Sequence, residues 1–160
     1  MDNKEEFNWT PEETAKELIK LVPIVKGDRF YEPFKGRGAF YDLMPEPKDW
    51  SEIGEGKDFL TYEGKCEHII TNPPWNKGNE GLDINTIVNK CFEVSTKSVN
   101  LLLSSKALNF MTPKRLTAYE QRGWTITAIH ILNVKKWYGR YFFIQFRKDT
   151  PSIITWHKED

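Results

Sequence analysis

Residues 68–75 combine a short apolar run with a stiff polar turn, and they read His68-Ile69-Ile70-Thr71-Asn72-Pro73-Pro74-Trp75. The first four residues predict a buried strand, and the turn follows at its carboxyl end. The two prolines fix φ and leave two main-chain carbonyls without competing local N–H groups. Asn72 adds a side-chain carbonyl oxygen, and Trp75 adds a flat ring for stacking. This turn therefore suits a flat heterocycle held by its exocyclic amino group.

A second informative turn reads Glu32-Pro33-Phe34-Lys35-Gly36-Arg37-Gly38, between a predicted strand and a predicted helix. Open α/β sheets bind ligands at such turns. The two glycines allow a ligand to approach the backbone, and the helix start favours an anionic group such as a carboxylate. The dinucleotide fingerprint and the phosphate-loop lysine pattern are both absent. A plain strand–helix turn would use the same glycines, so this turn alone leaves both interpretations open.

The rest of the chain alternates between helical and strand patterns. Helices are expected over 11–22, 39–44, 84–95 and 112–121, and strands over 29–31, 49–53, 68–71, 99–103, 125–134, 141–147 and 152–156. Thr10 is expected to cap the first helix, with Pro11 at its first position. The continuous apolar run at 99–103 is typical of a central parallel strand. Alternation followed by late consecutive strands predicts an α/β sheet with an antiparallel edge.

Size and composition indicate one globular catalytic domain over residues 1–160. The hydrophobic share is 39% and the charged share is 29%, which is ordinary for a folded domain. No apolar run reaches the length of a membrane span. The two cysteines make no disulfide framework and the three histidines are widely spaced, so no metal site is expected. A reduced, intracellular, cytoplasmic protein is the expectation.

The net charge of zero hides a division along the chain. Residues 84–148 carry 11 Lys and Arg against 2 Asp and Glu, whereas residues 1–60 carry 9 against 14. A basic second half favours an anionic partner such as nucleic acid. The alternative is a set of solvated lysines scattered over several faces.

Together the two turns resemble a known family. The glycine-containing turn and Asn72-Pro73-Pro74-Trp75, 40 residues apart from Glu32 to Asn72, are similar to S-adenosylmethionine-dependent methyltransferases of the amino-methylating type. The signature (D/N)-P-P-(aromatic) belongs to adenine methyltransferases of DNA and RNA and to release-factor glutamine methyltransferases. The resemblance covers roughly residues 10 to 147. It implies a Rossmann-like class I fold, with helices on both faces of a mostly parallel sheet and an antiparallel edge strand.

The resemblance also implies where S-adenosyl-L-methionine would bind. The residues that match cofactor-binding positions are Thr10, Glu32, Pro33, Phe34, Gly36, Gly38, Glu52, Asp58, Phe59 and Asn72. Glu52 matches the acidic residue that usually holds the ribose hydroxyls, although Glu55 is a close competitor. Asp58 and Phe59 match the pair around the cofactor adenine. Glu32 opens the glycine-containing turn, where it could meet the cofactor's ammonium group.

The catalytic residues that the resemblance implies are Asn72, Pro73, Pro74 and Trp75. An adenine amino nitrogen is a poor nucleophile because its lone pair is delocalised into the ring. Acceptance of its N–H bonds by the Asn72 amide and the Pro73 carbonyl would localise that lone pair and stabilise the developing positive charge. Trp75 would stack on the base. Positioning and electrostatics do most of this chemistry, and a duplex substrate would require base flipping.

Basic and aromatic residues after the second turn are the candidates for substrate contact. They are Lys77, Lys106, Lys135, Lys136, Trp137 and Arg140. Lysine and arginine suit phosphate contact, and an aromatic ring suits base stacking. The alternatives are a plain surface loop around Lys77, solvation of Lys106, and a basic hairpin loop with one anchoring aromatic at 135–140.

No separate target-recognition domain is expected at this length. Specificity would then come from short loops or from a partner subunit, and the small size suits a virus- or mobile-element-encoded enzyme. Two other functions fit the same turns. One is methylation of a protein glutamine amide, and the other is a non-catalytic binding subunit that keeps the fold. The basic second half favours nucleic acid.

Overall fold

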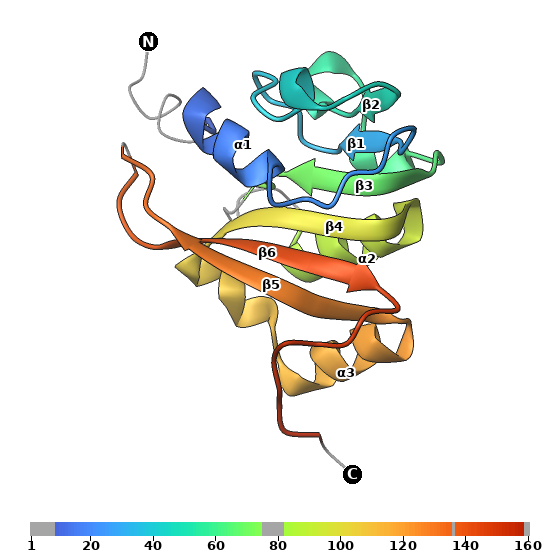
Figure 1. The fold of residues 1–160 in the computed structure, drawn as a ribbon, viewed down its shortest axis with the longest axis vertical. Helices are drawn as coiled ribbons and strands as arrows, with labels where there is room; N and C mark the ends of the chain where they lie inside the picture. Colours follow the sequence, from blue (N-terminus) through green and yellow to red (C-terminus); the bar gives the residue numbers. More distant parts are fainter. Residues whose placement is uncertain (1–8, 75–81, 136, 159–160) are drawn as a thin grey trace.

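A six-stranded sheet forms the centre of the protein, in the strand order β2-β1-β3-β4-β6-β5 (Figure 1). The computed structural model describes residues 9–74, 82–135 and 137–158. The strands are β1 (Phe30–Glu32), β2 (Lys48–Trp50), β3 (Cys66–Thr71), β4 (Ser95–Ser104), β5 (Trp124–Leu132) and β6 (Tyr141–Lys148). Neighbouring strands from β2 to β4 pair in parallel, and β6 runs antiparallel to both β4 and β5. The predicted mostly parallel sheet with an antiparallel edge is confirmed, with β6 second from that edge.

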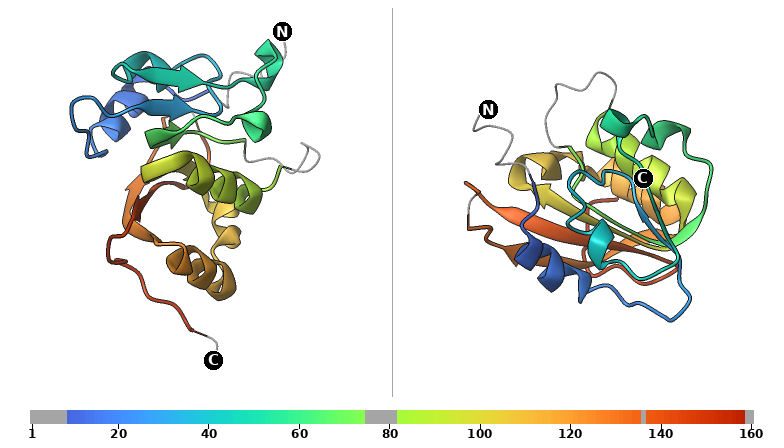
Figure 2. Two further views of the ribbon diagram at one scale, coloured as in Figure 1. Left: turned by 90° about the vertical axis from the view of Figure 1, so that its right-hand side faces the viewer. Right: turned by 90° about the horizontal axis from the view of Figure 1, so that it is seen from above.

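Helices cover both faces of the sheet (Figure 2). They are α1 (Glu12–Ile19), α2 (Ile84–Val94) and α3 (Pro113–Gln121). One apolar cluster packs α2 and α3 against the sheet, and a second packs α1 against the opposite face. No helix in the described part of the chain is long and apolar enough to cross a membrane.

The apolar run in β4 is buried on both sides, as the sequence predicts. Leu101 and Leu103 belong to the cluster under α2 and α3, whereas Leu102 belongs to the cluster under α1. Side chains alternate between the two faces of a strand, so a run of consecutive apolar residues fits a strand that is covered on both faces. β4 is therefore a central strand, parallel to β3 and antiparallel to β6.

Three elements differ from the sequence prediction. The segment 39–44 holds only a 3₁₀ turn, Tyr41–Leu43, because an α-helix needs more residues than the glycine-containing turn and Pro45 leave between them. The second strand is Lys48–Trp50, which places Glu52 in the turn beyond it. The helix α1 begins after Pro11 without a side-chain cap, so Thr10 is not its N-cap.

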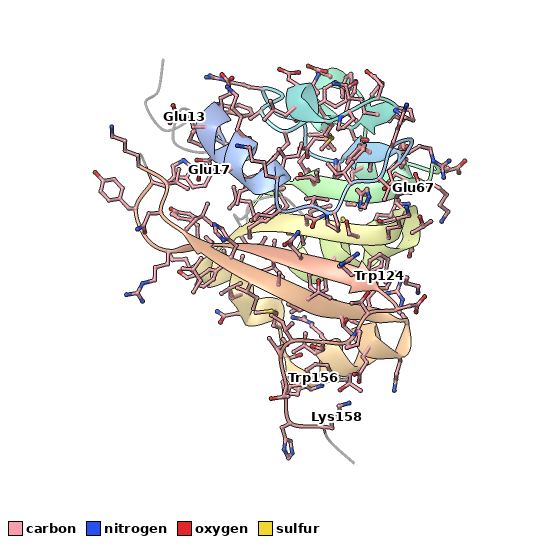
Figure 3. All side chains as sticks on the ribbon, viewed as in Figure 1. Glu13, Glu17, Glu67, Trp124, Trp156 and Lys158 are labelled. Atoms are coloured by element: carbon pink, nitrogen blue, oxygen red, sulfur yellow. The ribbon has the colours of Figure 1, made fainter. Side chains whose placement is uncertain are left out.

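The prediction of a final strand over 152–156 is also wrong, because the structure has no strand there. This segment shares one backbone hydrogen bond with β5, from Ile153 N to Ile126 O at 3.0 Å. Side chains hold the segment instead, since the Trp156 indole donates to Thr117 on α3 and Lys158 pairs with Glu120 (Figure 3). The Ser152 hydroxyl bonds to the backbone of Ile154, and such local bonds compete with a strand ladder.

A buried polar network lies at the edge of the sheet where the parallel strands β1, β3 and β4 begin, which we call the amino end of the sheet. The His68 imidazole lies 2.7 Å from both the Asp28 carboxylate and the Ser98 hydroxyl. The Asn100 side-chain amide donates to the Ser98 hydroxyl, and the Gln145 side-chain amide donates to the side-chain carbonyl oxygen of Asn100. The ionised Asp28 carboxylate can only accept, so the neutral His68 ring donates to it from Nε2, and the ring Nδ1 accepts the Ser98 hydroxyl proton. The network therefore joins β3, β4 and β6 to the loop before β1.

Candidate active site

A cavity of about 710 Å³ opens at the carboxyl ends of β1 and β3. It brings together eleven of the residues that the sequence singles out. They are Thr10, Glu32, Pro33, Phe34, Gly36, Glu52, Asp58, Phe59, Asn72, Pro73 and Pro74. Parallel strands carry their following loops to one edge, so two turns 40 residues apart in the chain line a single space.

Glu32 ends β1 and lies at the bottom of this cavity. Its side chain is 2% exposed, and its carboxylate accepts a hydrogen bond from the Phe34 N–H at 3.1 Å. Burial raises the pKa of Glu32 well above its ordinary value, and the Thr71 hydroxyl and the hydrogen bond from the Phe34 N–H offset only part of this effect. Among the described residues, no lysine or arginine forms an ion pair with Glu32. A cationic ligand group at this position would stabilise the ionised carboxylate.

Glu52, rather than Glu55, faces the cavity. Its carboxylate accepts from the Gly36 N–H at 2.8 Å and from the Gly54 N–H at 3.3 Å, which fixes its orientation. Glu55 instead pairs with Lys35 at 3.1 Å and does not line the cavity. The structure thus separates the two acids that the sequence leaves in competition. Glu52 remains available to accept hydrogen bonds from ligand hydroxyl groups.

The side wall of the cavity is apolar and partly open. Phe34 and Phe59 pack edge to face, with ring centroids 5.1 Å apart. Ile53 and Leu60 also line the cavity, and they are 76% and 42% exposed. Asp58 begins the short turn that carries Phe59 and accepts from the Leu60 N–H at 2.9 Å. This combination of exposed apolar groups and one carboxylate suits a flat base with an amino group.

The glycines of the first turn make room for the chain's own side chains. Gly36 has φ +53°, and a Cβ built there would lie 2.3 Å from the indole of Trp9. The Arg37 guanidinium lies over the same indole at 5.0 Å. Gly38, at φ +88°, does not line the cavity, and a Cβ there would lie 3.0 Å from the Asp42 carboxylate. Close packing of Trp9, rather than ligand approach alone, therefore requires glycine at position 36.

Asn72 is joined to the N-terminal segment. Its amide nitrogen donates to the Thr10 hydroxyl at 3.0 Å, across 62 residues of sequence. Pro73 is buried and Pro74 partly buried, and both line the cavity beside Asn72. Thr10 therefore touches the second turn while its neighbour Trp9 touches the first. The N-terminal segment closes one side of the cavity by contacts to both turns.

The remaining predicted site residues lie outside the cavity or outside the described residues. Trp75, Lys77 and Lys136 lie outside the described residues. Lys106 begins the turn after β4, and Lys135, Trp137 and Arg140 lie in the loop between β5 and β6. None of these four lines the cavity. These four residues lie at the same edge of the sheet as the cavity, because β4 ends at this edge and β6 begins there.

Sequence reasoning missed several residues that line the cavity. Trp9, Arg37, Ile53 and Leu60 are the clearest of them. A bulky apolar residue within two positions after each predicted acid was the available signal for Ile53, which follows Glu52, and for Leu60, which follows Asp58. An aromatic residue directly before Thr10 was the signal for Trp9. Only the folded chain shows that Trp9 reaches Gly36.

No protein-family model matches this sequence, and no curated protein matches it either. Solved structures of similar fold do exist. A candidate RNA methyltransferase from Pyrococcus horikoshii superposes with a TM-score of 0.63 at 17% identity, over 87% of this chain and 86% of that chain.

Two further structures of similar fold contain a ligand. Magnesium protoporphyrin IX methyltransferase from Synechocystis PCC 6803, with bound SAH, gives a TM-score of 0.62 at 10% identity, over 86% of this chain and 82% of that chain. TYW2 from M. jannaschii, in complex with AdoMet, gives a TM-score of 0.54 at 14% identity, over 91% of this chain and 79% of that chain. At identities this low the likeness is one of fold. The expected Rossmann-like fold of methyltransferase type is confirmed.

Proposed function

We propose that this protein is an S-adenosylmethionine-dependent methyltransferase that modifies the exocyclic amino group of adenine in DNA or RNA. One observation carries the proposal. A single cavity joins a wall of acids and aromatic rings to the turn of Asn72, Pro73 and Pro74. A methyl donor on the wall and an amino-bearing acceptor at the turn would then share one space. The fold of known methyltransferases supports the same conclusion.

The residues on the wall fit S-adenosylmethionine group by group. Glu32 would pair with the ammonium of its amino-acid part, which would supply the cation that this buried carboxyl otherwise lacks among the described residues. Glu52 would accept from the ribose hydroxyls. Asp58 and Phe59 would hold the adenine against Ile53, which is 76% exposed without a ligand. The cofactor supplies the electrophilic methyl group.

The residues of the second turn fit an aromatic amino group as acceptor. The Asn72 side-chain carbonyl and the Pro73 main-chain carbonyl would accept its two N–H bonds, which localises the nitrogen lone pair. The same two oxygens would stabilise the positive charge that develops during transfer. Thr10 holds the Asn72 amide by the 3.0 Å hydrogen bond, so the acceptor oxygens are fixed before the base arrives. Trp75 would stack on the base.

The substrate class rests on charge. The segment 84–148 carries 11 Lys and Arg against 2 Asp and Glu, and its basic loops follow strands that end beside the cavity. We assign phosphate or base contact to Lys77, Lys106, Lys135, Lys136, Trp137 and Arg140. Further selection of the target would come from a partner subunit.

Mass spectrometry of modified nucleosides tests this proposal directly. The purified protein is incubated with S-adenosylmethionine carrying a deuterated methyl group and with DNA, RNA or protein pools. Labelled N6-methyladenosine or its deoxy form is the expected product. Label on a protein glutamine amide would instead support the second family activity. Absence of S-adenosylhomocysteine binding in calorimetric titration would contradict both and leave a non-catalytic subunit.

A further inference from the structure

The loop between β5 and β6 projects past the carboxyl ends of β3 and β4 (Figure 1). Its backbone is held at several points. The Trp137 N–H donates to the Val134 carbonyl at 2.9 Å, and the Tyr141 hydroxyl donates to the carbonyl of Tyr138. The Ser105 N–H, at the end of β4, donates to the carbonyl of Arg140 at 3.0 Å. The loop is therefore fixed to the sheet next to the cavity.

The two aromatic side chains of this loop have different environments. Trp137 is partly buried, and its ring packs on that of Tyr141 with centroids 4.9 Å apart. Tyr138 is 92% exposed, the most exposed large side chain among the described residues with apolar rings or chains. Trp137 thus anchors the loop. Tyr138 presents its ring to solvent, open to stacking by a flat ligand.

Exposed cationic side chains lie in the same loop as Tyr138 and in the turn that is bonded to this loop. Lys135 and Arg140 are exposed in the same loop, and Lys106 is exposed in the turn that Ser105 joins to Arg140. An exposed ring among cations is the arrangement that binds a nucleobase and its phosphates.

The strand register gives the separation between this loop and the second turn, which contains Asn72, Pro73 and Pro74. Thr71 pairs with Leu101, and Ser104 pairs with Tyr141, so the second turn and the start of β6 lie at similar levels. One strand, β4, separates β3 from β6. Two strand spacings are roughly 10 Å, which is about three stacked nucleotides. The loop therefore lies too far away to contact the target base and close enough to contact its neighbours.

We propose that Tyr138 is a stacking platform for a nucleobase that flanks the target adenine in an unpaired nucleic-acid strand. An exposed ring can stack only on a base whose face is free, and every base inside a duplex has both faces covered. DNA and RNA strands share this chemistry of base faces and phosphates. The inference rests on the proposed function for the identity of the target, and it assigns the stacking role to Tyr138 instead of Trp137.

Fluorescence anisotropy with labelled 12-mers tests this inference without requiring methyl transfer. The full chain, saturated with S-adenosylhomocysteine, is titrated with one adenine-containing sequence as single-stranded DNA, single-stranded RNA and duplex. Tyr138→Ala is expected to weaken single-strand binding at least about fivefold, and Tyr138→Phe to stay within about twofold of the parent protein. His157→Ala removes an exposed ring from the C-terminal segment and should change nothing, because its neighbours Trp156 and Lys158 lie away from the β5–β6 loop (Figure 3).

Three results would overturn the inference. They are equal affinity of Tyr138→Ala and the parent protein, equal losses in Tyr138→Ala and Tyr138→Phe, and absent or duplex-preferring binding by the parent protein. Thermal unfolding of each variant checks that the fold is kept. The proposed function fails separately: if no nucleoside is methylated but binding still depends on the Tyr138 ring, the platform stands without the enzyme. If adenine is methylated and Tyr138→Ala binds normally, only the platform fails.

Discussion

The two ends of the sheet each bury a carboxyl group in opposite electrostatic surroundings. At the amino end, burial opposes ionisation of Asp28, but the Lys97 ammonium and the His68 imidazole outweigh it and lower the pKa to about 2. At the carboxyl end, burial dominates and raises the pKa of Glu32. The chain supplies the partners of Asp28 itself. Under the proposed function, the amino end of the sheet serves stability, whereas Glu32 at the carboxyl end is the partner of the cofactor's ammonium group.

Substitution of Asn72 should give the largest effect and should change chemistry alone. Under the proposed function, Asn72→Ala removes a carbonyl that stabilises the transition state, so methyl transfer is expected to fall by about 100- to 1,000-fold. Cofactor affinity should stay nearly unchanged, because the wall residues remain. Single-turnover transfer and calorimetric titration measure the two quantities. Asn109→Ala, an exposed amide in the turn after β4, is the matched control. Equal losses of transfer and cofactor affinity would contradict the role of Asn72.

The matching change at the amino end should affect stability alone. Asp28→Asn leaves His68 and Lys97 without their carboxylate, and removal of one partner from a buried pair costs about 3 kcal/mol. The loss should be toward the low end of such values, because Lys97 is 48% exposed. Urea unfolding measures the loss, and S-adenosylhomocysteine affinity should be unchanged. A weakened cofactor site in a stable protein would show that the two ends are not separate.

Acidification should destabilise the fold in two pH ranges, through His68 and Asp28 at the amino end of the sheet. Burial lowers the pKa of His68 despite the opposing effect of Asp28, so the unfolded chain takes up this proton first and stability falls below about pH 6.5. Asp28, with its pKa lowered to about 2, stabilises the fold fully above about pH 4 and loses that contribution as pH falls toward 2. In a series of urea titrations, Asp28→Asn should remove the lower step and extend the upper step to lower pH, because His68 then loses the carboxylate that raises its pKa.

Glu32→Gln should have the next largest effect, a loss of affinity for S-adenosylhomocysteine. A charged hydrogen bond contributes roughly 2 kcal/mol, so S-adenosylhomocysteine should bind about 30-fold more weakly. Since the pKa of Glu32 is raised, parent affinity should also fall with acidification over a range above the ordinary carboxyl pKa, as the group becomes neutral. Glu32→Gln should flatten this dependence. Glu55→Gln, which loses only the pairing with Lys35, should keep the parent profile. A parent profile that is flat with pH would argue against an ammonium at Glu32.

Gly36→Ala should lower the free energy of unfolding by about 1–2 kcal/mol because of its left-handed backbone, in addition to the cost of moving Trp9. In a Trp9→Ala background the second cost disappears, so the penalty should drop by roughly 1 kcal/mol. Gly56→Ala is the matched control, because its φ is +78° and nothing lies within 4 Å of a Cβ there. Its penalty should be the same in both backgrounds. Equal Gly36→Ala penalties with and without Trp9 would disprove the packing of the N-terminal segment over the first turn.

Local patterns were sufficient for most of the helices and strands. The apolar run in β4, the Thr112 cap of α3 and the spacing of α2 depend on burial and on neighbours a few residues away, which the sequence displays directly. Predictions failed where distant residues compete with local preference. Thr10 has the residue type of an N-cap, but its hydroxyl bonds to Asn72 instead. The segment 152–156 has strand character, but bonds from its side chains hold it to α3.

The sequence by itself determined the α/β class, the two turns and the types of residue that they carry, because these follow from periodicity and from the chemistry of single side chains. Only the tertiary structure decided how those residues are used. It placed both turns on one cavity, chose Glu52 over Glu55, and brought Trp9 against Gly36. It also buried Trp137 while exposing Tyr138. These outcomes depend on packing between residues far apart in the chain, which no local pattern records.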